Sequence, residues 1–178
     1  MSRATVESML ENGHDSVIAS IIYYIIGGAP LVILHRFANT LDAMWGYKKP
    51  RFYSFGFASA RLDDLLGFVT GKCCTVLYAF QGNVIESIKN AYRQGNQYKS
   101  HNGGWVMAAG ATAMKIRLGG IANYHGTLIN SPTLGNGKPA TVEDIPRSVE
   151  VVQGATVRLL LIVFCVQSCF FYYQYFHQ

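Results

Sequence analysis

The chain contains few charged residues. Asp, Glu, Lys and Arg make up 14% of its 178 residues, whereas a soluble domain usually has about 25%. Half of the residues are hydrophobic, which excludes a disordered tail, and the length allows one domain over residues 1–178. The net charge of +5 accompanies long apolar segments, so a membrane with anionic headgroups is a simpler partner than nucleic acid.

The sequence also lacks the common signatures of metal, redox and nucleophilic chemistry. Its four cysteines form no C-x-x-C pair, and the motifs H-E-x-x-H, G-x-S-x-G and G-x-G-x-x-G are absent. The segment from Gly67 to Cys73 resembles a phosphate-binding loop, but it is one residue short and ends in Cys where Ser or Thr is needed. We expect the cysteines to be small, buried apolar residues.

Long apolar segments dominate what is present. Residues 17–34 and 159–176 carry no formal charge, and each is just long enough to cross a bilayer as a helix. Buried core helices of a soluble protein are the alternative. Gly27-Gly28-Ala29-Pro30 interrupts the first segment, which predicts either one continuous span or two half-helices that meet inside the membrane.

Two further segments are apolar but less suited to crossing. Residues 65–80 contain Lys72, so we expect an interfacial or re-entrant helix. The chain is rich in basic residues on both sides of this segment, which is typical of cytoplasmic loops. If both flanks are cytoplasmic, the segment cannot span the membrane. Residues 104–114 are rich in Gly and Ala, which favours close contact between helices. Residues 134–139 are expected to form a connecting turn.

Acidic and basic side chains cluster near these segments. Glu7, Glu11 and Asp15 are spaced i, i+4, i+8, which places three carboxylates on one helix stripe. The stripe is either a solvated face or a site for a divalent metal or an amine. Farther along, Arg36, Asn39 and Asp42 share a helix face, and Arg61 and Asp64 are spaced to pair, which leaves Asp63 free.

Two later segments could contact a ligand. Asn102 precedes two glycines and Trp105, so the backbone can approach a ligand while the indole packs against it. Arg117 precedes Gly119 and Gly120, a combination that offers a guanidinium group and bare amides to a phosphate or carboxylate.

Together these segments resemble the adenosylcobinamide-phosphate synthase family, the CobD/CbiB membrane proteins of cobalamin biosynthesis. The strings that carry the resemblance are Val6-Glu7-Ser8, Gly27-Gly28-Ala29-Pro30, Asn39-Thr40-Leu41-Asp42-Ala43-Met44, Ala60-Arg61-Leu62-Asp63-Asp64 and Arg117-Leu118-Gly119-Gly120. They follow one another in the family's order and cover nearly the whole chain.

The resemblance implies an all-α, polytopic protein of the inner membrane with two to four membrane-embedded helices or half-helices. It implies an enzyme that joins aminopropanol, or its phosphate, to the free propionate of adenosylcobyric acid by an amide bond. Because a carboxylate is a poor electrophile, ATP is the expected activator, with Mg²⁺ on its phosphates. Expected partners are these two substrates and membrane lipid, and no nucleic acid.

The polar segments suggest roles for individual residues in this reaction. The expected catalytic residues are Glu11, Asp42, Asp63 and Asp64. The expected substrate-binding residues are Asn39, Arg61, Asn102, Trp105, Arg117, Gly119 and Gly120. Glu7, Glu11 and Asp15 are the expected metal ligands.

The chain departs from the family pattern on both sides of Trp105. Gln94 stands where the family has Asp, Tyr98 where it has His, and Met107 where it has Glu. Family chains usually have a further membrane-embedded half upstream of the matching part. The expected activity therefore calls for a separate N-terminal half or a homo-oligomer. The alternatives are a regulatory membrane protein on the same scaffold, similar to AmpE-type proteins, and a purely structural membrane subunit.

Overall fold

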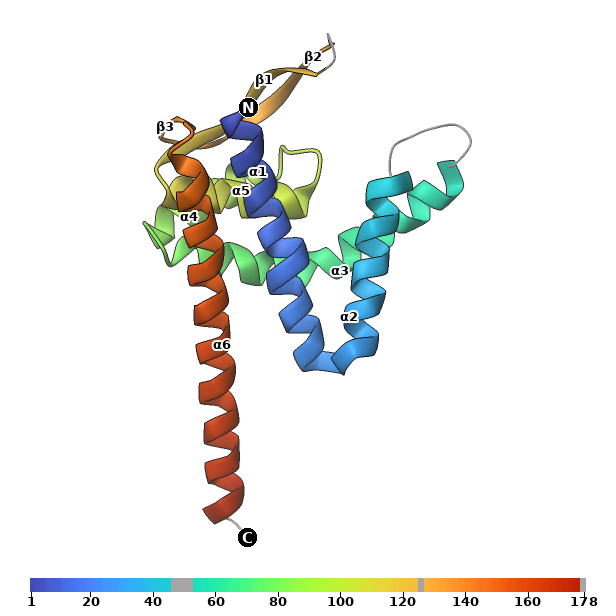
Figure 1. Cartoon of the computed structure of the whole chain (residues 1–178), viewed down its shortest axis with the longest axis vertical. Helices are drawn as coiled ribbons and strands as arrows, with labels where there is room; N and C mark the ends of the chain where they lie inside the picture. Colours follow the sequence, from blue (N-terminus) through green and yellow to red (C-terminus); the bar gives the residue numbers. More distant parts are fainter. Residues whose placement is uncertain (46–52, 125–126, 177–178) are drawn as a thin grey trace.

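The computed structural model describes all residues except 46–52, 125–126 and 177–178 (Figure 1). The described part is mostly helical, with one small sheet. In chain order its elements are α1 (Ser2–Asn12), η1 (Gly13–Ile18), α2 (Ala19–Trp45), α3 (Tyr53–Ala79), α4 (Val84–Asn90), η3 (Ala91–Gly95), α5 (His101–Ala113), β1 (Ile116–Tyr124), β2 (Thr127–Gly135), β3 (Lys138–Pro139) and α6 (Asp144–Phe176).

The first apolar segment is a hairpin of two helical arms. The arm formed by α1, η1 and the start of α2 ends at Gly27 and Gly28, whose backbone angles are not helical. Gly28 has φ +64° and ψ −158°, a conformation that essentially only glycine adopts. Pro30 follows in the first turn of the second arm, where a missing amide proton costs nothing. The chain then runs back towards its start (Figure 1), so of the two alternatives the structure has two half-helices and no continuous helix across this segment.

Helices α3 and α5 form the centre of the protein. Nearly all of α5 is buried, including Gly103, Gly104 and the residues from Val106 to Thr112. Its small side chains allow neighbouring helices to approach closely, as the sequence predicted. Residues 65–80 lie mostly in α3, a helix of 27 residues that is not among the candidate membrane spans of the described residues.

The sheet corrects the all-α expectation. Strands β1 and β2 pair antiparallel, with Arg117 opposite Gly135, and the short β3 pairs parallel with β1. The register shifts between Leu118 and Gly120, where Gly119 has φ +69°, the left-handed geometry of a glycine bulge. Residues 134–139 therefore include the end of β2 and all of β3, instead of only a turn, because their backbone groups pair with β1.

Helix α6 has two parts with different surroundings. Its first turns pack against α1 and α3, and Gln81 Nε2 donates a hydrogen bond to the Val151 carbonyl oxygen over 2.6 Å. From Leu160 onwards most side chains are exposed, including Cys165 and Cys169. These two cysteines, with exposed Cys73, contradict the expected burial, and only Cys74 is buried. They lie on helix faces that have no protein neighbour in the described residues.

Two helices of the described part are long and apolar enough to cross a membrane. By length and composition, one is the helical stretch Ser2–Trp45, which the break at Gly27 and Gly28 divides, and the other is Asp144–Tyr175. Only 11% of the first apolar window and 17% of the second are buried, whereas the core helix of a soluble protein is mostly buried. This exposure favours association with a membrane.

Candidate functional site

Helices α1, α3 and α5 meet at a junction lined by glycine. A Cβ added at Gly103 of α5 would lie 2.7 Å from Glu11 Oε1, and one added at Gly67 of α3 would lie 2.6 Å from Asn102 Nδ2. Such distances are shorter than real Cβ contacts. The glycines therefore give the polar side chains of α1 and α5 their space at the junction.

An acidic cluster lies at this junction: Glu11 of α1, Asp15 of η1, Asp42 of α2 and Asp63 of α3. Burial, followed by the charge of Asp15, raises the pKa of Glu11 to about 7. Burial, followed by the charge of Asp15, raises the pKa of Asp63 to about 6. Burial and the charge of Asp64 raise the pKa of Asp42. The fold has thus collected acids that are up to 52 residues apart in the sequence.

The two acids with the largest shifts differ in their hydrogen bonds. Asn39 Nδ2 donates to Asp63 Oδ1 over 3.3 Å, and this bond lowers the pKa of Asp63 against the larger effect of burial. Among the described residues, no group donates a hydrogen bond to the Glu11 carboxylate. A buried carboxylate without a donor is costly. Glu11 is therefore poised to accept a proton or to bind a cation.

Two buried histidines line the junction, and the sequence analysis did not single them out. His14 Nε2 lies 3.0 Å from Thr70 Oγ1, and His14 Nδ1 lies 2.7 Å from Asp15 Oδ1. The His35 ring lies 5.0 Å from the Tyr23 ring, and its Nδ1 has no hydrogen-bond partner among the described residues. From the sequence, only the position of His14 beside Asp15 could have indicated that a histidine lies at the acidic cluster.

The three expected metal ligands are not brought together as one site. Glu7 Oε1 accepts a hydrogen bond from the Gly119 amide over 2.8 Å and lies 3.8 Å from Arg3 Nε, so it holds α1 to the sheet. The π-helical turn η1 also rotates Asp15 relative to the stripe that a regular helix would give. Within the described ranges, no three His, Cys, Asp or Glu side chains are placed to hold a metal ion.

Asn102 and Trp105 already have protein partners. Asn102 Nδ2 donates to the Asp64 carbonyl oxygen over 3.0 Å, which fastens α5 to α3. Trp105 Nε1 donates to Asn96 Oδ1 over 2.7 Å, and Lys72 Nζ lies 2.8 Å from the centre of the Trp105 ring. Burial lowers the pKa of Lys72 to about 8. Lys72, which the sequence marked only as an obstacle to spanning, is thus the cation of a cation–π pair.

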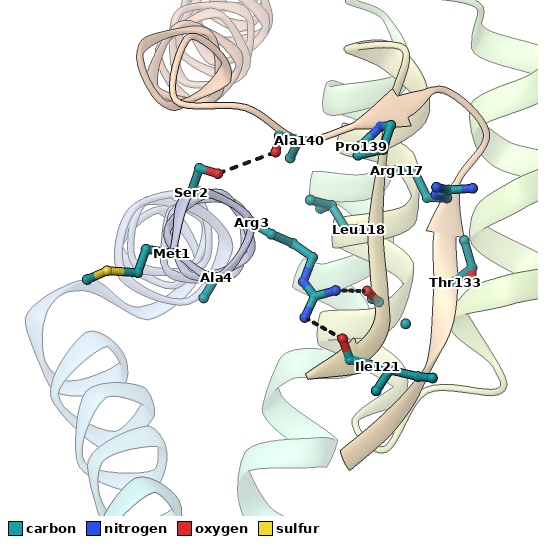
Figure 2. A pocket seen from close by; sticks show the side chains of 12 residues that line it. Met1, Ser2, Arg3, Ala4, Arg117, Leu118, Ile121, Thr133, Pro139 and Ala140 are labelled. Atoms are coloured by element: carbon teal, nitrogen blue, oxygen red, sulfur yellow. Dashed lines mark hydrogen bonds between the residues drawn. The ribbon is translucent and has the colours of Figure 1, made fainter. Parts of the chain in front are cut away.

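The expected arginine sites lie apart from the acidic cluster. Arg61 is exposed over the Phe57 ring, 5.2 Å from its centre, and makes no ion pair with Asp64 in the described part of the chain, contrary to the predicted pairing. Arg117, Gly119 and Gly120 border a cavity of about 750 Å³ between β1 and the start of α1. In Figure 2 Arg3 donates hydrogen bonds to the carbonyl oxygens of Gly119 and Ile121, whereas the side chain of Arg117 points away from Arg3.

The backbone of Gly119 is therefore less available to a ligand than the sequence suggested. The amide of Gly119 is bonded to Glu7 and its carbonyl oxygen to Arg3, so it presents no bare backbone groups. Residues 3 and 11 of one helix are about 12 Å apart along its axis, so the cavity and the acidic cluster are separate polar regions. The substrate-binding roles of Arg117, Gly119 and Gly120 stay predictions.

Comparison with known proteins covers most of the chain. The family model described as CobD/Cbib protein matches residues 1–152. A cobalamin biosynthesis protein CobD of Stutzerimonas stutzeri is 44% identical over 165 residues, which are 92% of this chain and 54% of the relative. That of Chromobacterium violaceum is 45% identical over 152 residues, 85% of this chain and 49% of the relative.

A CobD protein of Yersinia enterocolitica is 35% identical over 168 residues, 91% of this chain and 53% of its own. The chain thus spans about half the length of the curated relatives it matches. No solved structure matches the chain. The family model and the relatives show that this chain belongs to the CobD/Cbib protein family.

Proposed function

We propose that the protein acts in cobalamin biosynthesis, in forming the amide bond between the free propionate of adenosylcobyric acid and aminopropanol or its phosphate. Its relatives are named cobalamin biosynthesis proteins. The observation that carries the proposal is the acidic cluster, where Glu11 and Asp63 have pKa values of about 7 and about 6. These relatives are about twice as long as this chain, so the whole reaction is proposed for the chain together with a further half.

The acidic cluster suits the amine substrate. An alkylammonium ion must lose a proton before its nitrogen can attack a carbonyl carbon, and a general base works best when its pKa is close to the working pH. Glu11 meets this condition, and Asp63, which Asn39 orients, supplies a second negative charge that attracts the ammonium ion. We assign proton removal to Glu11 and ammonium binding to Asp63, with Asp42 and Asp64 contributing negative charge nearby.

ATP and Mg²⁺ belong to the proposal as the chemistry that activates the propionate. The described residues do not fit either group as they stand. They hold no three acids placed around a metal ion, and the sequence has no phosphate-binding loop. We therefore assign no residue and no step to ATP or Mg²⁺. We propose that this site comes from the part of the relatives that this chain does not match, supplied as a separate N-terminal half, or from a second copy of the chain.

Complementation tests the function. The chain is expressed in a strain that lacks the synthase, alone and together with the remaining half of a relative, and cobinamide formation is measured. We expect Glu11→Gln and Asp63→Asn to abolish the product, and the matched change Glu150→Gln, at an exposed residue of α6, to leave it unchanged. Full product from both cluster variants would refute the proposed roles of Glu11 and Asp63.

Corrinoid binding separates the enzyme from a regulatory protein on the same scaffold. The purified protein is titrated with adenosylcobyric acid, and the visible absorbance of the corrin ring is recorded. An absorbance shift that saturates is expected. A folded protein that leaves the spectrum unchanged would argue against the biosynthetic role. Membrane fractionation of the same cells tests the inner-membrane location, which the two exposed apolar helices support.

A further inference from the structure

The two arms of the hairpin in residues 17–34 lie side by side near their open end. Arg36 Nη1 donates to Ser16 Oγ over 2.9 Å and to the Asp15 carbonyl oxygen over 3.2 Å. The His35 and Tyr23 rings are 5.0 Å apart. The residues that enter the apolar segment thus contact the residues that leave it. A single helix crossing a bilayer would hold these ends about 30 Å apart.

Contacts with the rest of the chain also place the two ends of the apolar segment close together. Tyr23 OH donates to the Leu66 carbonyl oxygen of α3 over 2.6 Å. The charge of Asp63, which follows the apolar segment, contributes to the raised pKa of Glu11, which precedes the segment. Charged side chains interact in this way only over short distances, and they stay at the aqueous boundary of a membrane. Both flanks therefore lie on the same side.

The tip of the hairpin is apolar on all its exposed faces. Residues 17–34 carry no charge, and Ile25, Ile26 and Ile33 are about half to two-thirds exposed (49%, 67% and 54%). Residues 17–26 form an arm of about 15 Å, because a helix rises 1.5 Å per residue. That length is half of the roughly 30 Å hydrocarbon core of a bilayer. The hairpin is long enough to reach the centre of a membrane and too short to cross it.

We propose that the hairpin is a re-entrant element that inserts into one leaflet of a lipid bilayer and returns to the side from which it entered. The chain around it suits an anionic headgroup region, since residues 35–63 contain five Lys or Arg against two Asp. The apolar end of α6 projects from the same side of the protein body as the hairpin tip (Figure 1). This arrangement leaves α6 as the crossing helix of the described residues and replaces the multi-pass expectation there.

Labelling of single cysteines tests the sidedness. Exposed Cys73, Cys165 and Cys169 are replaced by Ala, and Cys74 is kept because it is fully buried. One cysteine is then placed at an exposed residue in the full chain: Ser8 before the hairpin, Ala29 at its tip, Ala43 after it, or Gln153 on the body side of α6. A membrane-impermeant maleimide is added to inside-out and to right-side-out vesicles.

We expect Ser8→Cys, Ala43→Cys and Gln153→Cys to be labelled in the same vesicle orientation and to lose all labelling in the other. Ala29→Cys is expected to react only after detergent is added. Ser8→Cys and Ala43→Cys labelled from opposite sides would show a spanning helix. Ala29→Cys labelled in intact vesicles would show a tip in water, and flanks protected in both orientations would show a protein cover. Each of these three results overturns the proposal.

The test does not depend on the proposed reaction, because it needs only the chain and a membrane. Vesicle flotation of the Ala29→Asp variant provides a second measurement. A charge at the tip is unfavourable in hydrocarbon, so we expect a smaller share of this variant than of Ala29→Leu to float with vesicles that contain anionic lipid. Equal flotation of the two variants would contradict insertion of the tip.

Discussion

The raised pKa of Glu11 makes the protein less stable as the pH increases. In the unfolded chain this carboxyl has its ordinary pKa of 4.5, and in the folded protein its pKa is about 7. Between these values the folded state binds the proton more tightly, so the free energy of unfolding falls as the pH rises from 4.5 to 7. A shift of this size corresponds to about 3 kcal/mol, since one pKa unit is about 1.4 kcal/mol.

The Glu11→Gln variant removes this dependence, because glutamine has no proton to lose. Thermal unfolding in detergent micelles, followed by circular dichroism from pH 5 to pH 8, measures the effect. For a chain of this size 1 kcal/mol changes Tm by about 2–4 °C. We therefore expect the wild-type Tm to fall by roughly 5–10 °C across this range, and the Tm of the variant to fall clearly less.

Asp63 leaves some pH dependence in the variant, because its pKa is raised to about 6. Its effect is largest between pH 4 and pH 6, so the difference between the two proteins is clearest from pH 6 to pH 8. The Glu150→Gln control, at an exposed residue, should follow the wild type. A Glu11→Gln variant with the wild-type slope, or a wild type that becomes more stable towards pH 8, would refute the assignment of a buried, proton-binding Glu11.

Three further outcomes are expected from the packing at the centre of the protein. Tyr78→Phe removes the 3.0 Å hydrogen bond to the Leu10 carbonyl oxygen from a fully buried position, which should cost about 1–2 kcal/mol in thermal unfolding. Gly95→Ala places a Cβ 2.7 Å from the backbone nitrogen of Trp105 and should destabilise by about 1–3 kcal/mol. The fluorescence of Trp105 should titrate near pH 8 with Lys72, and Lys72→Met should abolish that transition; a transition that persists would exclude the lysine as its source.

The sequence predicted the features that depend on local chain geometry. The break at Gly27 and Gly28 follows from the backbone freedom of glycine together with Pro30. The small residues of α5 likewise predicted close helix contacts, because side-chain size acts at the position itself. Such features need no knowledge of which distant segment lies opposite.

Features that depend on distant partners were missed. Gly119 and Gly120 were expected to offer bare backbone amides, but the Gly119 amide is bonded to Glu7, 112 residues earlier. The pairing of Arg61 with Asp64 has a suitable spacing, yet Arg61 lies over Phe57. His14 and His35 were overlooked because burial among α1, α2 and α3 is decided by tertiary packing, which no spacing in one segment reveals.

The attachment of α1 to β1 has a consequence for biosynthesis. Arg3 and Glu7 bind Gly119 across 116 and 112 residues, so a nascent chain cannot fix α1 until the ribosome has made β1. The apolar hairpin emerges long before that point and meets the membrane while its neighbours are still missing. Helix α1 is thus synthesised well before it is locked in place, and Glu7 reaches its partner only after β1 has been made.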